Sequence, residues 1–320
     1  MQHLLDVRNL NVEFALRTGS VRAVRDVSFT LDKGERLGLV GESGAGKSVT
    51  GFSIINLISK PGFISAGSVL FKGTNLAELK PEALRDIRGN RIAMIFQDPM
   101  MTLNPVLTVG SQMIETVRAH KKCSKREAEA IALEKLRKVS IPSPEKRLHQ
   151  YPHEFSGGMR QRIVIAISLL TDPDLIIADE PTTALDVTIQ AEIMELLLEL
   201  CASNDMGLIL ITHDLAVVSE VTRKIAVMYA GRIVEMGPTE KIVTDPGHPY
   251  TQGLIRALPQ SADPGGRLNQ IPGVMPSLVT LPPGCGFANR CERCTDVCRA
   301  ENPELRETAG GTLVACHLAE

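Results

Sequence analysis

The chain has 320 residues, of which 43 % are apolar and 22 % charged, a composition typical of a globular protein of about two domains. A net charge of −2, no Trp and only 3 Tyr and 8 Phe argue against a nucleic-acid partner, which would need a basic surface or aromatic platforms. No apolar run approaches the roughly 18 residues that cross a bilayer, and the first residues lack the apolar core of a secretion signal. We therefore expect any membrane role to come through a partner.

The first 40 residues predict antiparallel strands, because apolar and polar residues alternate in LLDVRNLNVEF and in VRAVRDVSFTL. The short apolar run RLGLVG then predicts a buried strand that leads directly into GESGAGKS. The segment KSVTGFSIINLI after it has helical spacing. Strands are predicted again from about residue 64, in ISAGSVLFKG, and at 91–98, in RIAMIFQD.

Residues 41–48 fit the G-x-x-x-x-G-K-[ST] pattern of a phosphate-binding loop and lie between a predicted strand and a predicted helix. Glycines let backbone N–H groups close around phosphate oxygens, and the helix N-terminus adds partial positive charge. We expect Lys47 to reach the β- and γ-phosphates and Ser48 to ligate Mg²⁺. The alternative, a chance Gly-rich turn, is disfavoured by the flanking strand and helix. The predicted ATP-binding residues here are Gly41, Glu42, Ser43, Gly44, Ala45, Gly46, Lys47, Ser48 and Val49.

Residues 107–170 are predicted to be mostly helical. Ser124 and Glu127 form the capping-box pattern S-K-R-E, and Ser156 stands where the helix of MRQRIVIAISLL would start. The loop FSGGM around Ser156 is a second Gly-rich helix N-terminus, and hence a second potential anion site. Because the phosphate loop already encloses the phosphates on one side, we expect this loop to act between subunits.

In that arrangement Ser156, Gly157 and Gly158 of one subunit cap the γ-phosphate held by Lys47 of another. ATP would then close two subunits, and hydrolysis would release them. A Gly-rich N-cap without any ligand is the alternative, since SGG alone is a weak signal.

The run LIIADE at 175–180 predicts a buried strand that delivers two acids to the edge where ligands of open α/β sheets bind. We expect Asp179 to hold Mg²⁺ through water and Glu180 to polarise the attacking water as general base. An ordinary helix-capping pair is the alternative. Gln97 and His213 each follow another predicted strand. Gln97 could touch Mg²⁺ or the water, or be an ordinary loop amide; His213 could reach the γ-phosphate, or be structural.

The runs at 174–179 and 207–212 are short and apolar, as in central parallel strands covered on both faces. TIQAEIMELLLELCA between them is predicted to be helical, which gives a strand–helix–strand order. KIAVMYAGRIVEMG predicts a hairpin that turns at Ala230-Gly231. Past Gly237 the composition changes, with helical HPYTQGLIRAL, a linker-like SADPGGRLNQIPG and a Cys-rich tail, so we place a domain boundary near 237.

The motifs GESGAGKS, FSGGMRQR, LIIADEP and ALD (184–186), with Gln97 and His213, resemble those of ATP-binding cassette (ABC) ATPases in order and spacing, over about residues 4–240. The resemblance implies an α/β P-loop NTPase cassette at 1–237. Such a cassette has a RecA-like core, an antiparallel β subdomain and a helical subdomain, here at about 98–172.

The same resemblance implies a head-to-tail dimer with two ATP molecules sandwiched between the cassettes. The Ser-Gly-Gly loop is then the signature that acts in trans, and Asp186 couples the two sites. Phe14 matches the aromatic residue that stacks on adenine. This chain departs from the family at Met159, where the signature usually has Gln.

The tail, residues 238–320, resembles the C-terminal extension of oligopeptide and dipeptide importer ATPases, a group that also includes glutathione and nickel importers. The resemblance is carried by HPYTQGLIRALP, IPG, GCGFANRC and ACH. It implies an ATPase that drives uptake of di- or oligopeptides, or of glutathione or a nickel chelate. The partners would be two integral-membrane permeases, an extracytoplasmic solute-binding protein and a second ATPase chain, identical or related. The chain would lie peripherally at the cytoplasmic face of the bacterial inner membrane.

Five cysteines crowd into residues 285–316, and thiolates at this density suit an iron–sulfur cluster or Zn²⁺. Related importer ATPases have four cysteines that match Cys285, Cys291, Cys298 and Cys316, and some hold a [4Fe–4S] cluster. We expect such a cluster in preference to zinc, with a metal-free, thiol-rich tail as the alternative. Cys294 is an additional thiol.

Two non-transport functions are alternatives. A DNA-repair or chromosome-organising cassette ATPase needs a long coiled-coil insertion between the phosphate loop and the signature, and this sequence has none. A translation factor of this class carries two cassettes in one chain, and only one is found. The transport reading is therefore preferred.

Overall fold

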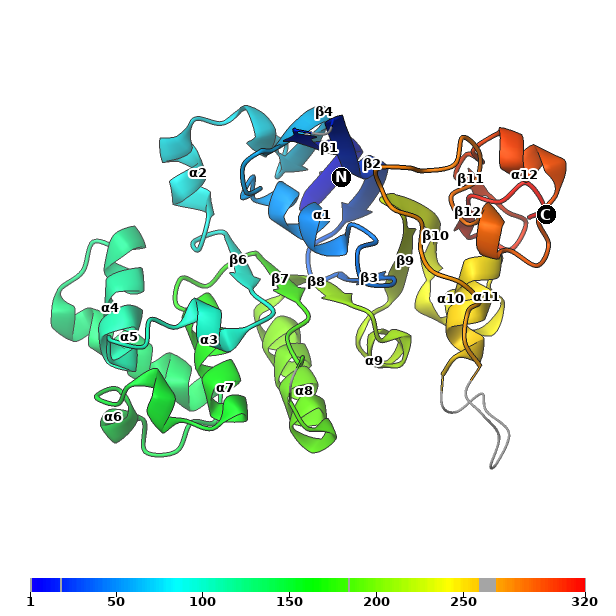
Figure 1. Cartoon of the computed structure of the whole chain (residues 1–320). Helices are drawn as coiled ribbons and strands as arrows, with labels where there is room; N and C mark the ends of the chain where they lie inside the picture. The colour runs from blue at the N-terminus through cyan, green and yellow to red at the C-terminus, as the bar shows by residue number, and fades with distance from the viewer. Residues whose placement is uncertain (1, 18, 184, 259–268, 320) are drawn as a thin grey trace. The chain divides into compact units, whose positions relative to one another are not determined.

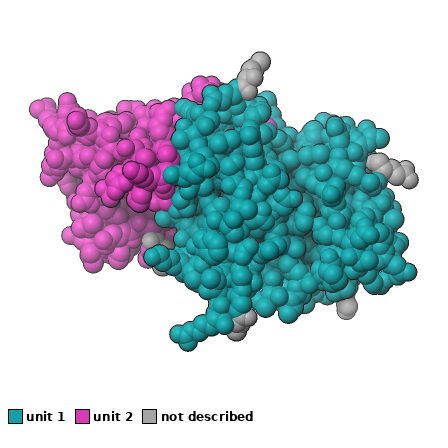
Figure 2. Space-filling view, turned by 90° about the horizontal axis from the view of Figure 1, so that it is seen from above, with its two compact units in different colours: residues 1–32, 36–78, 210–320 teal, residues 33–35, 79–209 magenta. Residues whose placement is uncertain are grey.

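The computed structural model describes residues 2–17, 19–183, 185–258 and 269–319. The chain divides into two compact units (Figure 2). Unit 1 comprises residues 1–32, 36–78 and 210–320, and unit 2 comprises residues 33–35 and 79–209. Residues 259–268, which include most of the predicted linker, and Ala184 of the ALD motif lie outside the described residues.

Unit 1 contains an antiparallel four-stranded sheet in the order β2-β1-β4-β5. Apolar residues of β1 at alternating positions, among them Leu5 and Val7, are at most 1 % exposed, which is why the alternating sequence forms a half-buried strand. The predicted antiparallel strands are confirmed. The strands are β1 (Leu5–Leu16), β2 (Gly19–Leu31), β4 (Gly62–Phe71) and β5 (Thr74–Asn75), followed by the 3₁₀ turn η1 (Leu76–Glu78).

Part of a second sheet lies in unit 1, with β11, β12, β10, β9 and β3 as neighbours in that order (Figure 1). β3 runs parallel to β9, and β9 and β10 form the predicted hairpin. Its two-residue turn has positive φ at both Ala230 (46°) and Gly231 (84°), the backbone twist that suits a tight hairpin. The strands are β3 (Arg36–Val40), β9 (Lys224–Tyr229), β10 (Arg232–Pro238), β11 (Arg306–Glu307) and β12 (Leu313–Val314).

Unit 1 also contains helices. They are α1 (Lys47–Ile54), α9 (Leu215–Val221), α10 (Thr239–Thr244), α11 (Pro249–Arg256), the 3₁₀ turn η4 (Ala288–Arg290) and α12 (Asp296–Ala300). The C-terminal extension joins the unit through β12, which pairs with β10, and through an aromatic cluster. Tyr250 is fully buried, with its ring centroid 4.6 Å from that of Tyr229 and 5.5 Å from that of Phe287. Aromatic contacts of this kind add about 0.5–1.5 kcal/mol per pair beyond area burial.

Unit 2 contains the parallel strand pair β6 and β7. The helices α4 to α7 form one group, coloured cyan to green in Figure 1. Its elements are α2 (Pro81–Ile87), β6 (Ile92–Ile95), α3 (Pro99–Thr102), α4 (Val109–His120), α5 (Lys125–Lys138), α6 (Pro144–Arg147), η2 (Pro152–Glu154), α7 (Gly157–Ser168), β7 (Leu175–Asp179) and α8 (Val187–Asn204). β8 (Gly207–Thr212), fully buried, is the strand at which the division between the units falls.

Two predicted helix starts in unit 2 are confirmed. Ser124 caps α5 in a complete capping box with Glu127. Ser156 caps α7 and accepts a hydrogen bond from the backbone N–H of Met159. No helix among the described residues is both long and apolar enough to cross a bilayer.

Candidate nucleotide-binding site

The phosphate loop joins the buried strand β3 to α1 in unit 1. The loop runs so close to neighbouring backbone that side chains do not fit. A Cβ at Gly41 would lie 2.2 Å from the carbonyl oxygen of Met228, and one at Gly46 would lie 2.6 Å from that of Ala23. Gly46 also has φ 101°, in the left-handed region that favours glycine. The glycines of the motif are therefore required by the packing of the loop.

Lys47 lies inside this loop and is 5 % exposed. Its Nζ donates to the carbonyl oxygens of Gly41 at 2.8 Å and of Glu42 at 3.0 Å. The loop thus holds one positive charge at the N-terminus of α1, where the helix dipole also favours an anion. Ser48 and Val49 follow in the first turn of α1, and Ser43, Gly44 and Ala45 complete the curve of the loop.

In unit 2, Glu180 and Gln97 are brought together although 83 positions separate them. Nε2 of Gln97 donates to Oε2 of Glu180 at 3.0 Å, and Oγ1 of Thr183 donates to the same oxygen at 2.9 Å. Glu180 has φ 45°, a left-handed conformation that is strained for a residue with a side chain and is common at functional sites. The preceding Asp179 ends β7, as predicted, and is 3 % exposed.

The Ser-Gly-Gly loop opens α7 and lies against the start of α8 within unit 2. A Cβ at Gly158 would lie 2.7 Å from Cγ2 of Ile189, and one at Gly157 would lie 3.3 Å from Cδ2 of Leu185. Asp186 is the N-cap of α8, with its Oδ1 accepting from the N–H of Ile189 at 3.1 Å. Close packing against the start of α8 thus explains why glycine occupies these two positions, independently of the predicted ligand.

Two further predicted residues lie in unit 1. His213 directly follows β8 and precedes Asp214, the N-cap of α9. Phe14 lies in β1, half-buried, and its ring edge covers Gly62, where a Cβ would be 2.6 Å from Cε1 of the ring. Tyr250 and Arg290 of the extension also contact the loop at Glu42. Both residues lie in segments that carry the resemblance of the tail, HPYTQGLIRALP and GCGFANRC, but nothing in the sequence links either residue to the phosphate loop.

The cysteine segment is where the sequence predicts a metal site. No group of three or more His, Cys, Asp or Glu side chains in the described part of the chain, which includes all five clustered cysteines, is placed to hold a metal ion. The thiols instead have local partners: Cys298 Sγ lies 3.2 Å from Oγ1 of Thr295, and Cys316 Sγ accepts from the N–H of Leu318 at 3.4 Å. Burial, with added repulsion from neighbouring thiols, raises the pKa of Cys285 and of Cys291, which favours the protonated thiol. The iron–sulfur expectation is therefore not supported.

A strand that ends in a phosphate loop and a second strand that ends in two acids define a P-loop nucleotide-hydrolysing protein. The model of the ABC transporter family matches residues 24–183, and that of the oligopeptide/dipeptide transporter C-terminal region matches residues 234–298. The chain belongs to the ATP-binding cassette transporter family. It is an ABC-type ATPase, and it therefore uses ATP and Mg²⁺.

The relatives of this chain resemble it over nearly its whole length. It is 50 % identical to the dipeptide transport ATP-binding protein DppD of Bacillus subtilis, over 100 % of this chain and 96 % of that protein. It is 48 % identical to DppD of Escherichia coli, over 98 % of this chain and 96 % of that protein. Among solved structures, the dimeric ATP-binding cassette MJ0796 bound to ADP and Pi matches with TM-score 0.66 and 26 % identity, covering 73 % of this chain and 98 % of that one. CbiO1 of Clostridium perfringens, part of a transporter complex, matches with TM-score 0.65 and 26 % identity, covering 77 % and 92 %.

Proposed function

We propose that this chain is the energising subunit of an importer for dipeptides and oligopeptides. The observation that carries the proposal is that one chain contains both a cassette and an extension of the oligopeptide/dipeptide transporter type. Over its full length, this chain is also 50 % identical to a dipeptide transport ATP-binding protein. Glutathione or a nickel chelate is the alternative cargo, because related extensions occur in those importers.

In the proposed reaction the loop residues from Gly41 to Val49 hold the triphosphate, and Lys47 neutralises its β- and γ-phosphates. Ser48, Gln97 and Asp179 hold Mg²⁺ directly or through water. Glu180 polarises the attacking water, and its orientation by Gln97 and Thr183 supports this role. His213 contacts the γ-phosphate, and Phe14 stacks on adenine.

The same proposal places the working site between two cassettes. Ser156, Gly157 and Gly158 at the N-terminus of α7 cap the γ-phosphate bound by the other chain, and Asp186 couples the two sites. The likeness to a cassette described as dimeric with ADP and Pi supports this arrangement. The second cassette is either another copy of this chain or a related chain.

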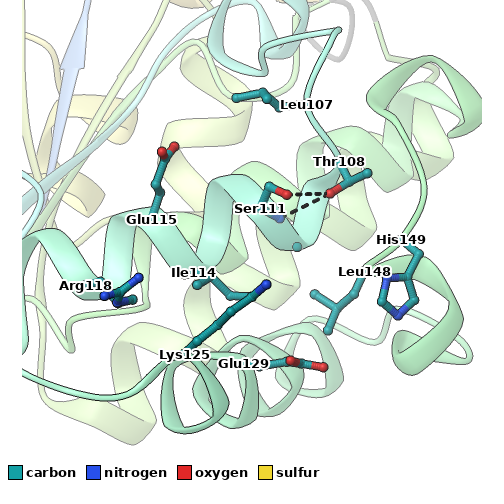
Figure 3. Close-up of a pocket in the computed structure, with 11 residues that line it drawn as sticks. Leu107, Thr108, Ser111, Ile114, Glu115, Arg118, Lys125, Glu129, Leu148 and His149 are labelled. Carbon is teal, nitrogen blue, oxygen red and sulfur yellow. Dashed lines mark hydrogen bonds between the residues drawn. The ribbon is translucent and has the colours of Figure 1, made fainter.

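The helical region of unit 2 supplies a surface for the permeases. Segment 97–105 carries the exposed Met100 (47 %), and Val106 beside it is 75 % exposed. Next to this segment, a cavity of about 500 Å³ opens beside α4 and α5, lined by Leu107, Ser111, Ile114, Glu115, Arg118, Lys125, Glu129, Leu148 and His149 among others (Figure 3). We infer that a permease segment docks here. This docking holds the chain peripherally at the cytoplasmic face of the bacterial inner membrane, and an extracytoplasmic solute-binding protein delivers the cargo.

A [4Fe–4S] cluster at Cys285, Cys291, Cys298 and Cys316 is not part of this proposal, since no group of three or more His, Cys, Asp or Glu side chains among the described residues is placed to hold a metal ion. Iron and sulfide analysis of anaerobically purified protein is the measurement that would restore it.

The test is uptake of labelled di- and oligopeptides by a strain that lacks this gene and is complemented with wild type or with Lys47→Ala. We expect uptake to be restored by wild type alone. Parallel assays with glutathione and with chelated nickel distinguish the cargoes. Restored uptake of either, without peptide uptake, would replace the peptide assignment; co-purification with ribosomes or DNA and not with permeases would contradict the transport function.

A further inference from the structure

The C-terminal extension meets the phosphate loop at its second residue, Glu42. The backbone N–H of Glu42 donates to the hydroxyl of Tyr250, with the two atoms 2.9 Å apart. Nη1 of Arg290 lies 3.0 Å from each carboxylate oxygen of Glu42. The peptide and the side chain of one loop residue are therefore both held by groups that lie 208 and 248 positions further along the chain.

Arg290 is itself fixed in place on the extension. Its Nε donates to the carbonyl oxygen of Pro272 at 2.8 Å, and its Nη2 donates to that of Ile271 at 3.3 Å. The side chain is only 6 % exposed, against 31 % for Glu42. A guanidinium this buried depends on its carboxylate partner, because an unpaired buried charge is strongly unfavourable. The guanidinium carbon of Arg290 also lies within 6 Å of the centroids of two aromatic rings, those of Tyr229 and Phe287, which adds a cation–π attraction.

Glu42 links this anchor to Lys47. The peptide whose N–H Tyr250 holds carries the carbonyl oxygen of Gly41, which accepts from Nζ of Lys47 at 2.8 Å. The carbonyl oxygen of Glu42 accepts from the same Nζ at 3.0 Å, so a shift of Glu42 displaces both carbonyl partners that hold the lysine in the loop. The extension also passes over the middle of the loop, since a Cβ at Gly44 would lie 3.0 Å from Cε of Met275. The conformation of the loop therefore depends on residues outside the motif.

We propose that Arg290 and Tyr250 are positioning residues for ATP: they hold the Glu42 peptide so that the loop presents Lys47 to the triphosphate, and the extension thereby sets the affinity for MgATP. They bond to Glu42 and act through it. The inference rests on the proposed role of the loop and Lys47 in binding the triphosphate.

The experiment measures the Kd of MgATP by calorimetry, and KM and kcat by phosphate release, on the full chain. The variants are Arg290→Gln, Glu42→Gln and the two combined. We expect each single change to weaken MgATP binding by about tenfold, with KM raised and kcat changed far less, because a charged hydrogen-bonded pair is lost. The double variant should bind MgATP no more weakly than either single variant, because each single change already removes the contact between Arg290 and Glu42.

Arg299→Gln is the matched control, since Arg299 lies in the same segment, is 64 % exposed and pairs only loosely with Asp296 at 3.6 Å. It should bind MgATP as wild type does. Arg290→Lys should recover part of the affinity, because an ammonium restores the charge that faces Glu42 without the N–H groups that donate to Pro272 and Ile271. A merely structural role would lower the melting temperature and the active fraction without a change in the Kd of the folded protein.

Tyr250→Phe guards against unfolding of the Arg290 variant, because it keeps the buried ring and removes only the hydroxyl that accepts from Glu42. We expect a severalfold weaker Kd for MgATP at nearly unchanged melting temperature. Wild-type affinity in both Tyr250→Phe and Arg290→Gln, or additive losses in the double variant, would overturn the inference. Failure of the wild-type chain itself to bind MgATP would instead contradict the proposed function of the loop.

Discussion

Gln97 donates a hydrogen bond to the Glu180 carboxylate, with its Nε2 3.0 Å from Oε2, and Thr183 donates to the same oxygen. A carboxylate held by two donors keeps one orientation, which is what a general base needs before its water arrives. The strained backbone of Glu180, with φ 45°, adds to the view that this position is maintained for function.

Replacing Glu180 by Gln should remove the base while leaving the shape of the side chain. We expect ATP hydrolysis to fall by about 10²- to 10⁴-fold, the usual contribution of general acid–base catalysis, with MgATP still bound. Phosphate release and equilibrium titration measure the two effects. Glu195→Gln, an exposed acid on α8, is the control and should hydrolyse ATP normally. Unchanged turnover in Glu180→Gln would remove Glu180 from the mechanism.

Lys47→Ala should weaken nucleotide binding itself. The buried ammonium of Lys47 is the positive charge of the loop that would bind the phosphates. Its loss matters because charge-assisted hydrogen bonds are about twice as strong as neutral ones. We expect MgATP affinity to fall at least about tenfold, as for loss of a charged hydrogen bond. Titration of the purified chain measures this, and Lys80→Ala, at an exposed lysine, serves as the control. Equal affinities in the two variants would show that the loop does not bind through Lys47.

Ser156→Arg should damage hydrolysis while the isolated subunit still binds nucleotide, because the signature is proposed to act on ATP held by another chain. The change also removes the N-cap bond to Met159, which costs about 1 kcal/mol of stability, so the melting temperature must be measured as well. Ser143→Arg is the control: Ser143 is an exposed N-cap whose side chain makes no capping bond. Loss of nucleotide binding by monomeric Ser156→Arg would mean that the loop works within its own chain.

His248 predicts a pH dependence of stability. Burial lowers the pKa of this fully buried imidazole to about 3, and its Nδ1 accepts from the N–H of Tyr250 as the cap of α11. The folded chain therefore keeps His248 neutral, while the unfolded chain protonates it below about pH 6.5. The stabilising contribution is present above that pH and is lost as the pH falls toward 3, by about 1.4 kcal/mol per pH unit.

Denaturant unfolding at several pH values between 7 and 4.5 measures this effect. His248→Asn keeps a side-chain acceptor for the cap and has no proton to gain, so its free energy of unfolding should fall less steeply with acid than that of wild type. His149→Gln, at an exposed histidine, should follow the wild-type slope. Parallel curves for wild type and His248→Asn would refute the buried neutral state.

The local parts of the nucleotide site could be predicted from the residues alone. The loop at 41–48, the acids at the end of β7 and the caps at Ser124 and Ser156 depend on neighbours within a few positions, so short patterns carry their geometry. The strand alternation of the first 40 residues could also be predicted, because a buried face selects apolar residues at every second position. The hairpin turn could be placed from Gly231, since glycine favours a positive φ, whereas the positive φ of Ala230 is not expected from its residue type.

The metal site predicted in the cysteine segment is the part of the sequence prediction that the described residues do not support. Five thiols within 32 positions predict a set of metal ligands, but ligand geometry depends on where each side chain points. Here Cys298 Sγ contacts the hydroxyl of Thr295, and Cys316 Sγ accepts from the backbone N–H of Leu318. The spacing of cysteines along the chain does not specify the direction in which each side chain points. An expectation built on spacing alone therefore carries less weight than the phosphate loop, whose backbone geometry follows from its glycines.

The sequence by itself thus determined the class of this protein, because a phosphate loop, a pair of acids and a helix N-terminus are each encoded by consecutive residues. Only the tertiary structure decided that Gln97 orients Glu180 and that Arg290 and Tyr250 hold Glu42. These pairs lie between 83 and 248 positions apart. Nothing periodic connects such residues, and the members of each pair meet only because distant segments pack together within their own unit.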